Sequence, residues 1–245
     1  MTAGIILAGG KGTRLQSTEV NKVVLPLHGK PLIQYGVELL TPHTSPLIVV
    51  LGAFSESVKR VLENYDVTYA YQEVQKGTGH AVQIALPHLE GKDVKQVYVG
   101  YGDHMMFYTK RTVEQMKQAC TEDVAIVMVT SKVENPLGLG RILRDSDGKV
   151  RGVVEEKDAS ENEKSIKEIN AGFYLFSYEF LRYAIQQLTP SPISGELYLT
   201  ELVQIAVNQK RNVVGLEVAY EEMGIGINTK EELGQSAELF EKRLK

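Results

Sequence analysis

Residues 3–15 read Ala-Gly-Ile-Ile-Leu-Ala-Gly-Gly-Lys-Gly-Thr-Arg-Leu, an apolar run that turns directly into a glycine-rich loop. The run from Ala3 to Ala8 predicts a buried strand, because no polar residue interrupts it. Three glycines then follow within four positions, where backbone N–H groups can approach and bind phosphate oxygens. Lys11 and Arg14 add positive charge that suits a polyphosphate. The stretch therefore predicts a strand that ends in a phosphate-binding loop.

The loop matches neither of the two commonest phosphate-binding motifs. The P-loop pattern is absent, and Leu15 stands where the dinucleotide pattern Gly-x-Gly-x-x-Gly requires its last glycine. A tight turn with a solvated lysine is the alternative interpretation of the loop taken alone. Its function must be decided from the rest of the chain.

Further along the chain, short apolar runs alternate with segments of helical spacing, which is typical of βαβ units and a mostly parallel sheet. We expect strands at 47–51, 67–71, 97–101, 124–129, 169–176 and 213–218. We expect helices after an N-cap at Ser55 and over 79–89, 109–120, 196–208 and 229–245. The turn Asp145-Ser146-Asp147-Gly148 predicts a hairpin between 141–144 and 150–154. The expected fold is one α/β unit that gains antiparallel strands in its second half.

The composition excludes several classes of function. The 245 residues carry 27 basic and 31 acidic side chains, a formal charge of −4, so no basic surface for nucleic acid is expected. No apolar stretch reaches the roughly 18 residues of a transmembrane helix, and the N-terminus lacks a basic leader. The single cysteine, Cys120, fits a reducing compartment. We expect a cytoplasmic protein with no nucleic-acid or membrane partner.

Polar residues follow the strand expected at 67–71. Gln72 comes directly after it, and Gly77-Thr78-Gly79-His80 opens the next helix. A side-chain amide beside a glycine-opened helix start can bind the edge of a nucleotide base. A turn followed by an N-cap is the alternative, and this piece alone favours that alternative.

A carboxylate follows the strand expected at 97–101, in the sequence Tyr101-Gly102-Asp103-His104. Asp103 suits Mg²⁺, which takes few protein ligands and completes its shell with phosphates. A helix cap or turn is the alternative, and His104 is a poorer ligand for so hard a cation. Because the carboxyl ends of parallel strands share one edge of a sheet, the loop, the amide and this carboxylate are expected to meet there.

At these residues the chain resembles a known family, the nucleotide-diphospho-sugar pyrophosphorylases or sugar-1-phosphate nucleotidyltransferases. The closest similarity is to the uridylyltransferase domain of the bifunctional enzyme that makes UDP-N-acetylglucosamine. The similarity covers nearly the whole chain and consists of ordered motifs at 7–15, 21–32, 77–82, 135–142, 155–158, 169–172, 195–201 and 225–228.

The resemblance implies a Rossmann-like nucleotide-diphospho-sugar transferase fold, which is similar to the GT-A fold. In that fold a mostly parallel central sheet is flanked by helices and carries a small antiparallel sugar-binding part. The nucleotidyltransferase domain would span 1–228, with a nucleotide-binding half at about 1–110 and a sugar-binding half at about 111–228. Residues 229–245 would form a C-terminal helix.

The resemblance also implies roles for individual residues. Catalytic residues would be Arg14, Lys22 and Asp103. Nucleotide-binding residues would be Leu7, Ala8, Gly9, Gly10, Lys11, Gly12, Gln72, Gly77, Thr78, Tyr101 and Gly102. Sugar-binding residues would be Gly140, Glu155, Asn170 and Asn228, and Mg²⁺ would be bound by Asp103 and Asn228.

The implied reaction converts UTP and N-acetylglucosamine-1-phosphate to UDP-N-acetylglucosamine and pyrophosphate, with Mg²⁺ as cofactor and in-line attack on the α-phosphorus. Glucose-1-phosphate as acceptor, dTTP as donor, or another phosphate acceptor on the same fold are alternatives. A non-catalytic regulatory module is the alternative from a different class. Retention of Arg14, Lys22, Asp103 and Asn228 favours the enzyme. The chain could also form an oligomer.

Three features depart from the family pattern. Asn21 stands where the family usually has a proline before the signature lysine. His104-Met105-Met106 follows the metal aspartate, where the family usually has small apolar residues. The 245 residues contain none of the hexapeptide repeats that carry acetyl transfer in the bifunctional enzymes, so a complete chain of this length is expected to lack that activity.

Overall fold

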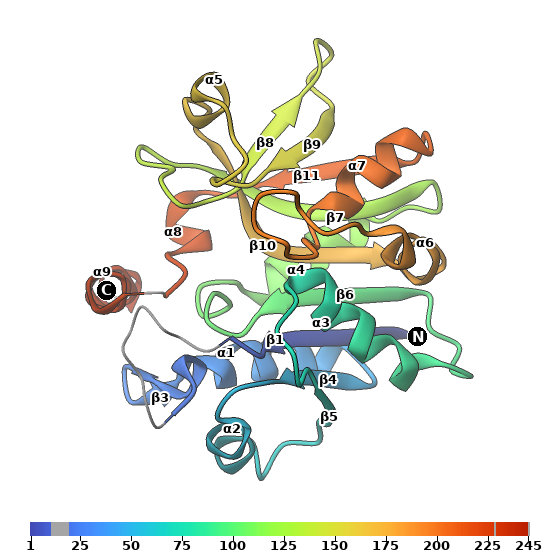
Figure 1. Ribbon diagram of the computed structural model, residues 1–245. Coiled ribbons are helices and arrows are strands. Elements are labelled where there is room, and N and C mark those ends of the chain that lie inside the picture. The colour runs from blue at the N-terminus through green and yellow to red at the C-terminus, as the bar shows by residue number, and fades with distance from the viewer. Residues whose placement is uncertain (11–19, 228, 245) are drawn as a thin grey trace.

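The computed structural model describes residues 1–10, 20–227 and 229–244 of the chain. Its centre is β1 (Thr2–Ala8), which is hydrogen-bonded on both sides in a nine-stranded sheet of these residues. The main order is β11-β7-β10-β6-β1-β4-β5, and the β8–β9 hairpin joins at β10 (Figure 1). The strands are β4 (Leu47–Leu51), β5 (Thr68–Tyr71), β6 (Gln96–Tyr101), β7 (Val124–Lys132), β8 (Arg141–Arg144), β9 (Val150–Val154), β10 (Glu168–Ser177) and β11 (Asn212–Glu217). A separate two-stranded sheet pairs β2 (Pro26–Leu27) with β3 (Lys30–Pro31).

The sheet is mostly parallel, as the alternation of strands and helices predicts. β6, β1, β4 and β5 form one parallel block, and β11 is parallel to β7. Antiparallel pairing enters with β10, which lies between β7 and β6, and with the β8–β9 hairpin. The change of strand direction thus occurs in the second half of the chain, at the predicted hairpin and the strand after it.

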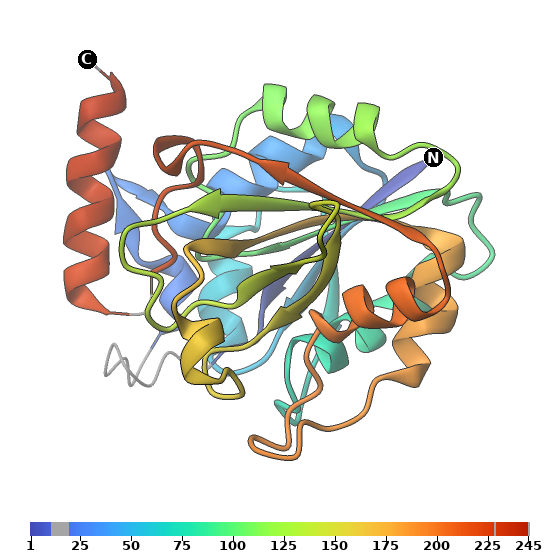
Figure 2. The ribbon, with the colours of Figure 1, turned by 90° about the horizontal axis from the view of Figure 1, so that it is seen from above.

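Helices cover both faces of the sheet because successive residues of a strand point to opposite faces. Ile5 belongs to a core cluster that includes residues of α3, α6 and α7, whereas its neighbour Ile6 belongs to one that includes residues of α1, α2 and α4. Seen from above, the sheet lies between these two groups of helices (Figure 2). The helices are α1 (Leu32–Leu40), α2 (Ser55–Val61), α3 (Thr78–Ala85), α4 (Lys110–Ala119), α5 (Glu161–Lys164), α6 (Tyr178–Ala184), α7 (Glu201–Asn208), α8 (Tyr220–Met223) and α9 (Lys230–Leu244). Short 3₁₀ helices lie at Lys22–Val24, Thr41–His43, Leu86–Leu89 and Ile185–Gln187.

Two local predictions are wrong. Ser55 is the first residue of α2, and the N-cap is Phe54, whose backbone is left-handed at φ 57°. The helix expected over 196–208 begins only at Glu201, because residues 197 and 199 form hydrogen bonds with the loop after β5 instead of helical ones. This second difference positions part of the functional site.

The C-terminal helix α9 packs on a small cluster of its own at the edge of the molecule (Figure 2). The Phe240 ring stacks on His28 at 5.1 Å between ring centroids and meets Tyr35 and Phe107 edge-on at 5.5 and 5.8 Å. Within the part of the chain that the structure describes, none of the helices combines the length and the apolar character that a membrane crossing requires.

Replacing Phe240 with alanine should detach α9. The substitution removes three ring contacts, and we expect the free energy of unfolding to fall by about 2–3 kcal/mol. Chemical denaturation measures the change. Glu238→Ala, at an exposed position of the same helix, is the matched control and should change stability by less than about 0.5 kcal/mol. Equal effects of the two variants would contradict this account of α9.

Candidate active site

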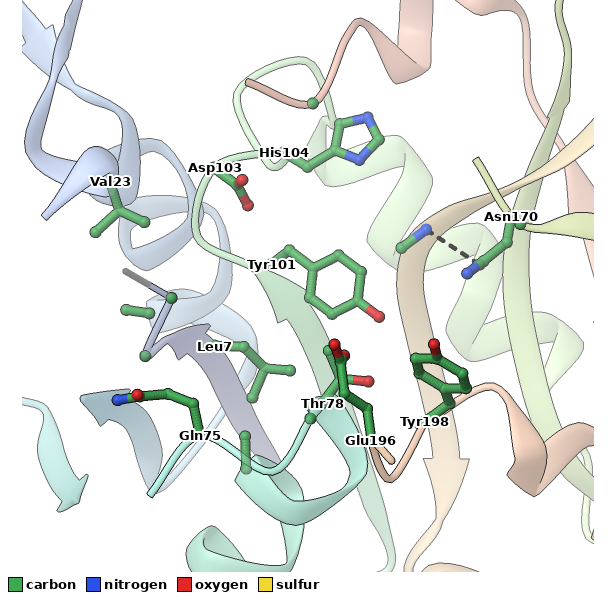
Figure 3. A pocket seen from close by; sticks show the side chains of 18 of the residues that line it. Leu7, Val23, Gln75, Thr78, Tyr101, Asp103, His104, Asn170, Glu196 and Tyr198 are labelled. Atoms are coloured by element: carbon green, nitrogen blue, oxygen red, sulfur yellow. Dashed lines mark hydrogen bonds between the residues drawn. The ribbon is translucent and has the colours of Figure 1, made fainter. Parts of the chain in front are cut away.

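The carboxyl ends of the parallel strands lie level with one another. Ala8 of β1 pairs with Leu51 of β4, and Leu7 pairs with Tyr101 of β6. The chain segments that follow these strands therefore leave the sheet at the same edge. A pocket of about 490 Å³ opens there and reaches across to β10. In Figure 3, Leu7 and Asp103 lie on one side of Tyr101, whereas Asn170 and Tyr198 lie on the other.

Most of the site residues expected from the sequence come together in this pocket. It is lined by Leu7, Ala8, Gly9, Gly10, Lys22, Gln72, Gly77, Thr78, Tyr101, Asp103, Gly140, Glu155 and Asn170. Gly102 lies behind the lining, where its N–H donates to the carbonyl of Leu7 at 3.0 Å. Lys11, Gly12, Arg14 and Asn228 lie outside the described residues. The location of these residues is thus established for the lining set, while their roles remain predictions.

The glycine-rich loop begins with a close backbone contact. A Cβ on Gly52, after β4, would lie 2.3 Å from the carbonyl oxygen of Gly9, so the two loops touch through backbone atoms alone. A Cβ on Gly9 would in turn lie 2.9 Å from Oε1 of Gln72. A side chain at Gly52 would separate the loops, and one at Gly9 would displace the Gln72 amide. The contact keeps the first described residues of the loop level with Gln72.

Asn21 links the chain on either side of residues 11–19. Its side chain is fully buried, and its amide nitrogen donates to the carbonyls of Ala8 at 2.9 Å, Ala53 at 2.8 Å and Gly10 at 3.3 Å. Its backbone N–H donates to the hydroxyl of Ser57 at 3.0 Å. Proline, the usual family residue, has neither the amide nor the N–H. The departure from the family pattern therefore introduces hydrogen bonds that hold the residue before Lys22 in place.

Lys22 and Asp103 form an ion pair in the pocket. Lys22 opens the 3₁₀ helix that Asn21 caps, and Asp103 follows β6. The two side chains are only 16% and 14% exposed, so their charges are partly shielded from water. The backbone carbonyl of Asp103 also accepts a hydrogen bond from the N–H of Ile227 at 3.2 Å. A lysine from the 3₁₀ helix and a carboxylate from the end of β6 thus meet where the sequence predicted catalytic groups.

The Gln72 side chain is buried beside the pocket and held by its amide nitrogen. Nε2 donates to the carbonyl of Gly77 at 3.0 Å and lies 3.0 Å from Nδ1 of His80. Among the described residues no donor is bonded to Oε1, which faces Gly9 in the pocket lining. The amide therefore presents a hydrogen-bond acceptor to a ligand.

Residues 196–200 form part of the pocket wall because they pack against the loop after β5. The N–H of Leu197 donates to the carbonyl of Lys76, and its own carbonyl accepts from the N–H of Gly79, both at 2.8 Å. Gly77 has φ 106°, and a Cβ there would lie 2.5 Å from the carbonyl oxygen of Leu197. The Gly-Thr-Gly sequence is thus required for this close contact between the two segments.

The structure adds Gln75, Glu196, Tyr198 and His104 to the residues that line the pocket. Glu196 and Tyr198 were missed because their segment reads as the start of a helix (Figure 3). His104 is buried, and its ring lies against Gly172 and Gly226, whose added Cβ atoms would be 3.6 and 3.4 Å from Nδ1. The sequence offers no signal for that burial, since an isolated histidine is usually packed or solvated.

The far side of the pocket is formed by β10 and the β8–β9 hairpin. The N–H of Asn170 donates to the carbonyl of Gly140 at 2.8 Å, and its side-chain amide donates to the hydroxyl of Tyr174 at 2.6 Å. Asn170 and Gly140, both predicted to bind a sugar, are therefore joined by a hydrogen bond. Arg141, 1% exposed, pairs with Glu156 at 2.7 Å and fixes the hairpin beside them.

Two neighbouring carboxyl groups differ in electrostatic environment. Burial raises the pKa of Glu155, although the hydroxyl of Thr200 donates to it at 2.7 Å and opposes the shift. The hydrogen bond from Arg141 lowers the pKa of Glu156. Glu155 lines the pocket and Glu156 does not, so the carboxyl that is costly to bury is the one available to a ligand.

A comparison with protein-family models matches residues 3–221 to the family described as nucleotidyl transferase. The chain belongs to the nucleotidyl transferase family. This confirms the family predicted from the sequence.

Two curated relatives of this nucleotidyl transferase are the bifunctional proteins GlmU of Exiguobacterium sibiricum and Caldicellulosiruptor saccharolyticus. They are 38% and 37% identical to it, over 98% and 94% of the chain. The matches cover 53% and 50% of those proteins, so the chain spans about half the length of the curated relatives it matches.

A similar fold occurs in a solved structure, a putative glucose-1-phosphate thymidylyltransferase from Bacillus anthracis. The TM-score is 0.79 at 21% sequence identity, over 98% of this chain and 95% of the other. At that identity the similarity concerns the fold alone. Together with the sheet topology it confirms the predicted Rossmann-like nucleotide-diphospho-sugar transferase fold.

Replacing Asn21 with alanine should destabilise the protein strongly. The buried carbonyl of Ala8 and the partly buried carbonyls of Ala53 and Gly10 lose their donor, and an unsatisfied buried group is costly, so we expect a loss of about 2–3 kcal/mol in the free energy of unfolding. Asn21→Asp, which keeps the shape but not the donor, should behave similarly. Asn162→Ala on exposed α5 is the control. Denaturation midpoints that match the unsubstituted protein for both Asn21 variants would refute this role.

The neighbouring carboxyls should respond oppositely to substitution by glutamine. The pKa of Glu155 lies above its unfolded value, so its ionisation costs stability above the folded pKa and nothing below the unfolded one. Glu155→Gln should therefore raise Tm at pH 7 and leave it unchanged near about pH 4.

The pKa of Glu156 lies below its unfolded value, so its stabilising contribution is present above the unfolded pKa and is lost as the pH falls through the folded pKa. Glu156→Gln should lower the free energy of unfolding at pH 7 by about 2 kcal/mol, because Arg141 loses its carboxylate partner. Thermal melts at both pH values measure the pair of variants. A fall in Tm for Glu155→Gln at pH 7 would contradict the assigned sign.

Proposed function

We propose that this chain transfers a uridylyl group from UTP to N-acetylglucosamine-1-phosphate, giving UDP-N-acetylglucosamine and pyrophosphate. The observation that carries the proposal is a single pocket with two chemically different sides. In the sheet, β1 with the glycines that follow it lies on one side of β6, and β10 with Asn170 lies on the other. Figure 3 shows Leu7 and Asn170 on opposite sides of Tyr101, the last residue of β6. Lys22, Gln72 and Glu155 line the same pocket. A nucleotide and a sugar phosphate bound there would meet between the two sides.

The amide of Gln72 supports a uracil base on the first side. Its carbonyl oxygen, which has no bonded donor among the described residues, can accept a hydrogen bond, and N3–H of uracil is a donor. Gly9 and Gly10 leave space for the triphosphate beside Lys22, and Lys11 and Arg14 are predicted to add positive charge there. These features support a nucleoside triphosphate whose base carries an in-plane N–H group.

The second side supports a sugar with several polar groups. Asn170 and Glu155 offer hydrogen-bonding side chains, and Tyr198 and Glu196 line the same wall. Relatives named GlmU, at 37–38% identity over nearly the whole chain, favour N-acetylglucosamine-1-phosphate as the acceptor. Those relatives are about twice as long as this chain, and their name describes the whole protein. The identity of the acceptor is therefore part of the proposal.

The proposed chemistry is one in-line displacement. A phosphate oxygen of the sugar phosphate forms a bond to the α-phosphorus of UTP, while the bond from that phosphorus to the α,β-bridging oxygen breaks. Pyrophosphate leaves with the bridging oxygen and its electron pair. No protein nucleophile is required, so the side chains act by positioning and by neutralising charge, as in other phosphoryl-type transfers. Lys22 is the described cation that would stabilise the leaving pyrophosphate.

The residues at the end of β6 fit Mg²⁺. Asp103 is a hard oxygen donor in the pocket, and Mg²⁺ usually takes one or two carboxylates together with substrate phosphates. No cluster of three or more His, Cys, Asp or Glu side chains occurs among the described residues, which suits such sparse ligation better than an all-protein cage. Asp103 and Asn228 would hold the ion, which would offset the negative charge of the triphosphate. Lys22 would then have to yield part of its contact with Asp103.

Glucose-1-phosphate and dTTP are the second candidate substrates. Thymine has the same N3–H group as uracil, so the Gln72 carbonyl accepts from either base. A structure of the same fold carries the name of a glucose-1-phosphate thymidylyltransferase. One missing polar contact changes discrimination by only about 1–3 kcal/mol. The choice therefore depends on a few contacts in the pocket.

Pyrophosphate release tests the proposal in a grid of UTP, dTTP and CTP against N-acetylglucosamine-1-phosphate and glucose-1-phosphate. We expect the strongest signal with UTP and N-acetylglucosamine-1-phosphate, and its loss when Mg²⁺ is chelated. Lys22→Ala should lower kcat by about 100-fold or more. Lys59→Ala, at a half-buried lysine paired with Glu56 outside the pocket lining, is the control and should retain full activity. Pyrophosphate release only with dTTP or only with glucose-1-phosphate would show that the proposed substrate is wrong. No release with any pair of substrates would refute the proposal.

A further inference from the structure

The direction of the Gln72 side-chain amide decides which bases its exposed end can bind. An amide has a donor end and an acceptor end, and turning it by half a rotation exchanges them. Uracil offers a donor at N3, whereas cytosine offers an acceptor at the same position. A carbonyl toward the base therefore favours uracil, and an NH₂ group favours cytosine.

Two neighbours hold the Gln72 amide with its carbonyl toward the base. The carbonyl oxygen of Gly77 can only accept, so it requires the NH₂ end of Gln72 at 3.0 Å. Among the described residues, the second amide hydrogen has one bonded acceptor, Nδ1 of His80, also at 3.0 Å. Gln72 is 4% exposed, so water cannot easily replace either partner.

The acceptor role of His80 requires a neutral ring with its proton on Nε2. Burial lowers the pKa of His80, and the charge of Lys76 lowers it further, which favours the neutral ring. A hydrogen bond that a ring N–H makes with the backbone of Val74 raises the pKa and partly opposes this shift. With Nδ1 facing Gln72, that N–H is on Nε2. His80 itself does not line the pocket and acts only through Gln72.

We propose that His80 is a positioning residue for base recognition: by accepting a hydrogen bond at Nδ1 it keeps the carbonyl of Gln72 toward the base, and it thereby selects pyrimidines with a hydrogen on N3 over cytosine. The inference rests on the proposed function for its choice of ligand. It assigns to His80 a role that neither the pocket lining nor the sequence motif indicates. Uracil and thymine are bound equally by this device, and cytosine is rejected.

Equilibrium binding separates this role from catalysis, because it requires no turnover. The Kd values of UTP and CTP are measured by calorimetry, without sugar phosphate, for the unsubstituted protein and for three variants. His80→Leu removes the acceptor. His80→Asn keeps a short polar side chain that can supply one, and His88→Leu makes the same change at an exposed position just after α3.

We expect the preference for UTP over CTP to fall about tenfold in His80→Leu, the effect of one lost hydrogen bond on the amide direction. His80→Asn should restore most of the preference, and His88→Leu should leave it unchanged. A purely structural role of His80 would weaken both nucleotides equally and leave the ratio constant, which would overturn the inference. An unsubstituted protein with no preference for UTP would overturn it too.

The inference and the proposed function can fail separately. If UTP is preferred and His80→Leu loses that preference, the inference holds, even where no pyrophosphate is released and the proposed function fails. If pyrophosphate is released from UTP but the ratio is the same in His80→Leu, the proposed function holds and the inference is wrong.

Discussion

The parallel pairing of β1 with β4 and β6 is the constraint on which the rest of the site depends. It brings Ala8, Leu51 and Tyr101 to one edge of the sheet, so the groups that follow them are neighbours although far apart in sequence. A shift of one residue in this register would turn every side chain of β1 to the opposite face of the sheet and separate those groups. The site thus depends on the same alternation of side chains between the two faces of the sheet that divides the core into two layers.

Backbone contacts rather than side chains set the shape of the pocket. The Gly9–Gly52 and Gly77–Leu197 approaches leave no space for a Cβ. Asn21 adds a side chain whose hydrogen bonds, among the described residues, all go to backbone groups. Contacts between backbone atoms fix the relative positions of two segments closely, because few rotatable bonds lie between the touching atoms and the chain. They hold Lys22 and Gln72 in place while leaving the charged and polar ends of these residues toward a ligand.

Function at this site is set against stability. Burial raises the pKa of Glu155, so keeping this carboxyl in the pocket wall reduces the stability of the fold at neutral pH. Glu156, one residue along, makes the opposite contribution through Arg141. Adjacent glutamates thus serve separate purposes, one available to a ligand and the other holding the hairpin that positions it.

The sequence predicted the sheet and most of the site for identifiable reasons. Buried parallel strands such as β1 and β4 are uninterrupted apolar runs. Gln72 directly follows β5, and Asp103 comes two residues after the end of β6. No helix was predicted at α1, because Gly36 weakens the helical pattern there. That glycine lies close to Met105, whose Sδ would be 2.9 Å from an added Cβ. The prediction failed for residues 196–200 because helix and loop share the same apolar spacing, and contacts with residues 76–79 decide between them. The contacts of Asn21 and His104 depend on segments distant in sequence, which no local pattern reveals.

The central claim is that one pocket holds a nucleotide and a sugar at opposite sides of Tyr101. A crystal structure with UDP-N-acetylglucosamine, the product that spans both sides, tests it most directly. We predict the uracil against Gln72, the diphosphate between Gly9 and Lys22, and the sugar against Asn170 and Glu155. A sugar at Gln72, or a product bound outside this pocket, would contradict the account.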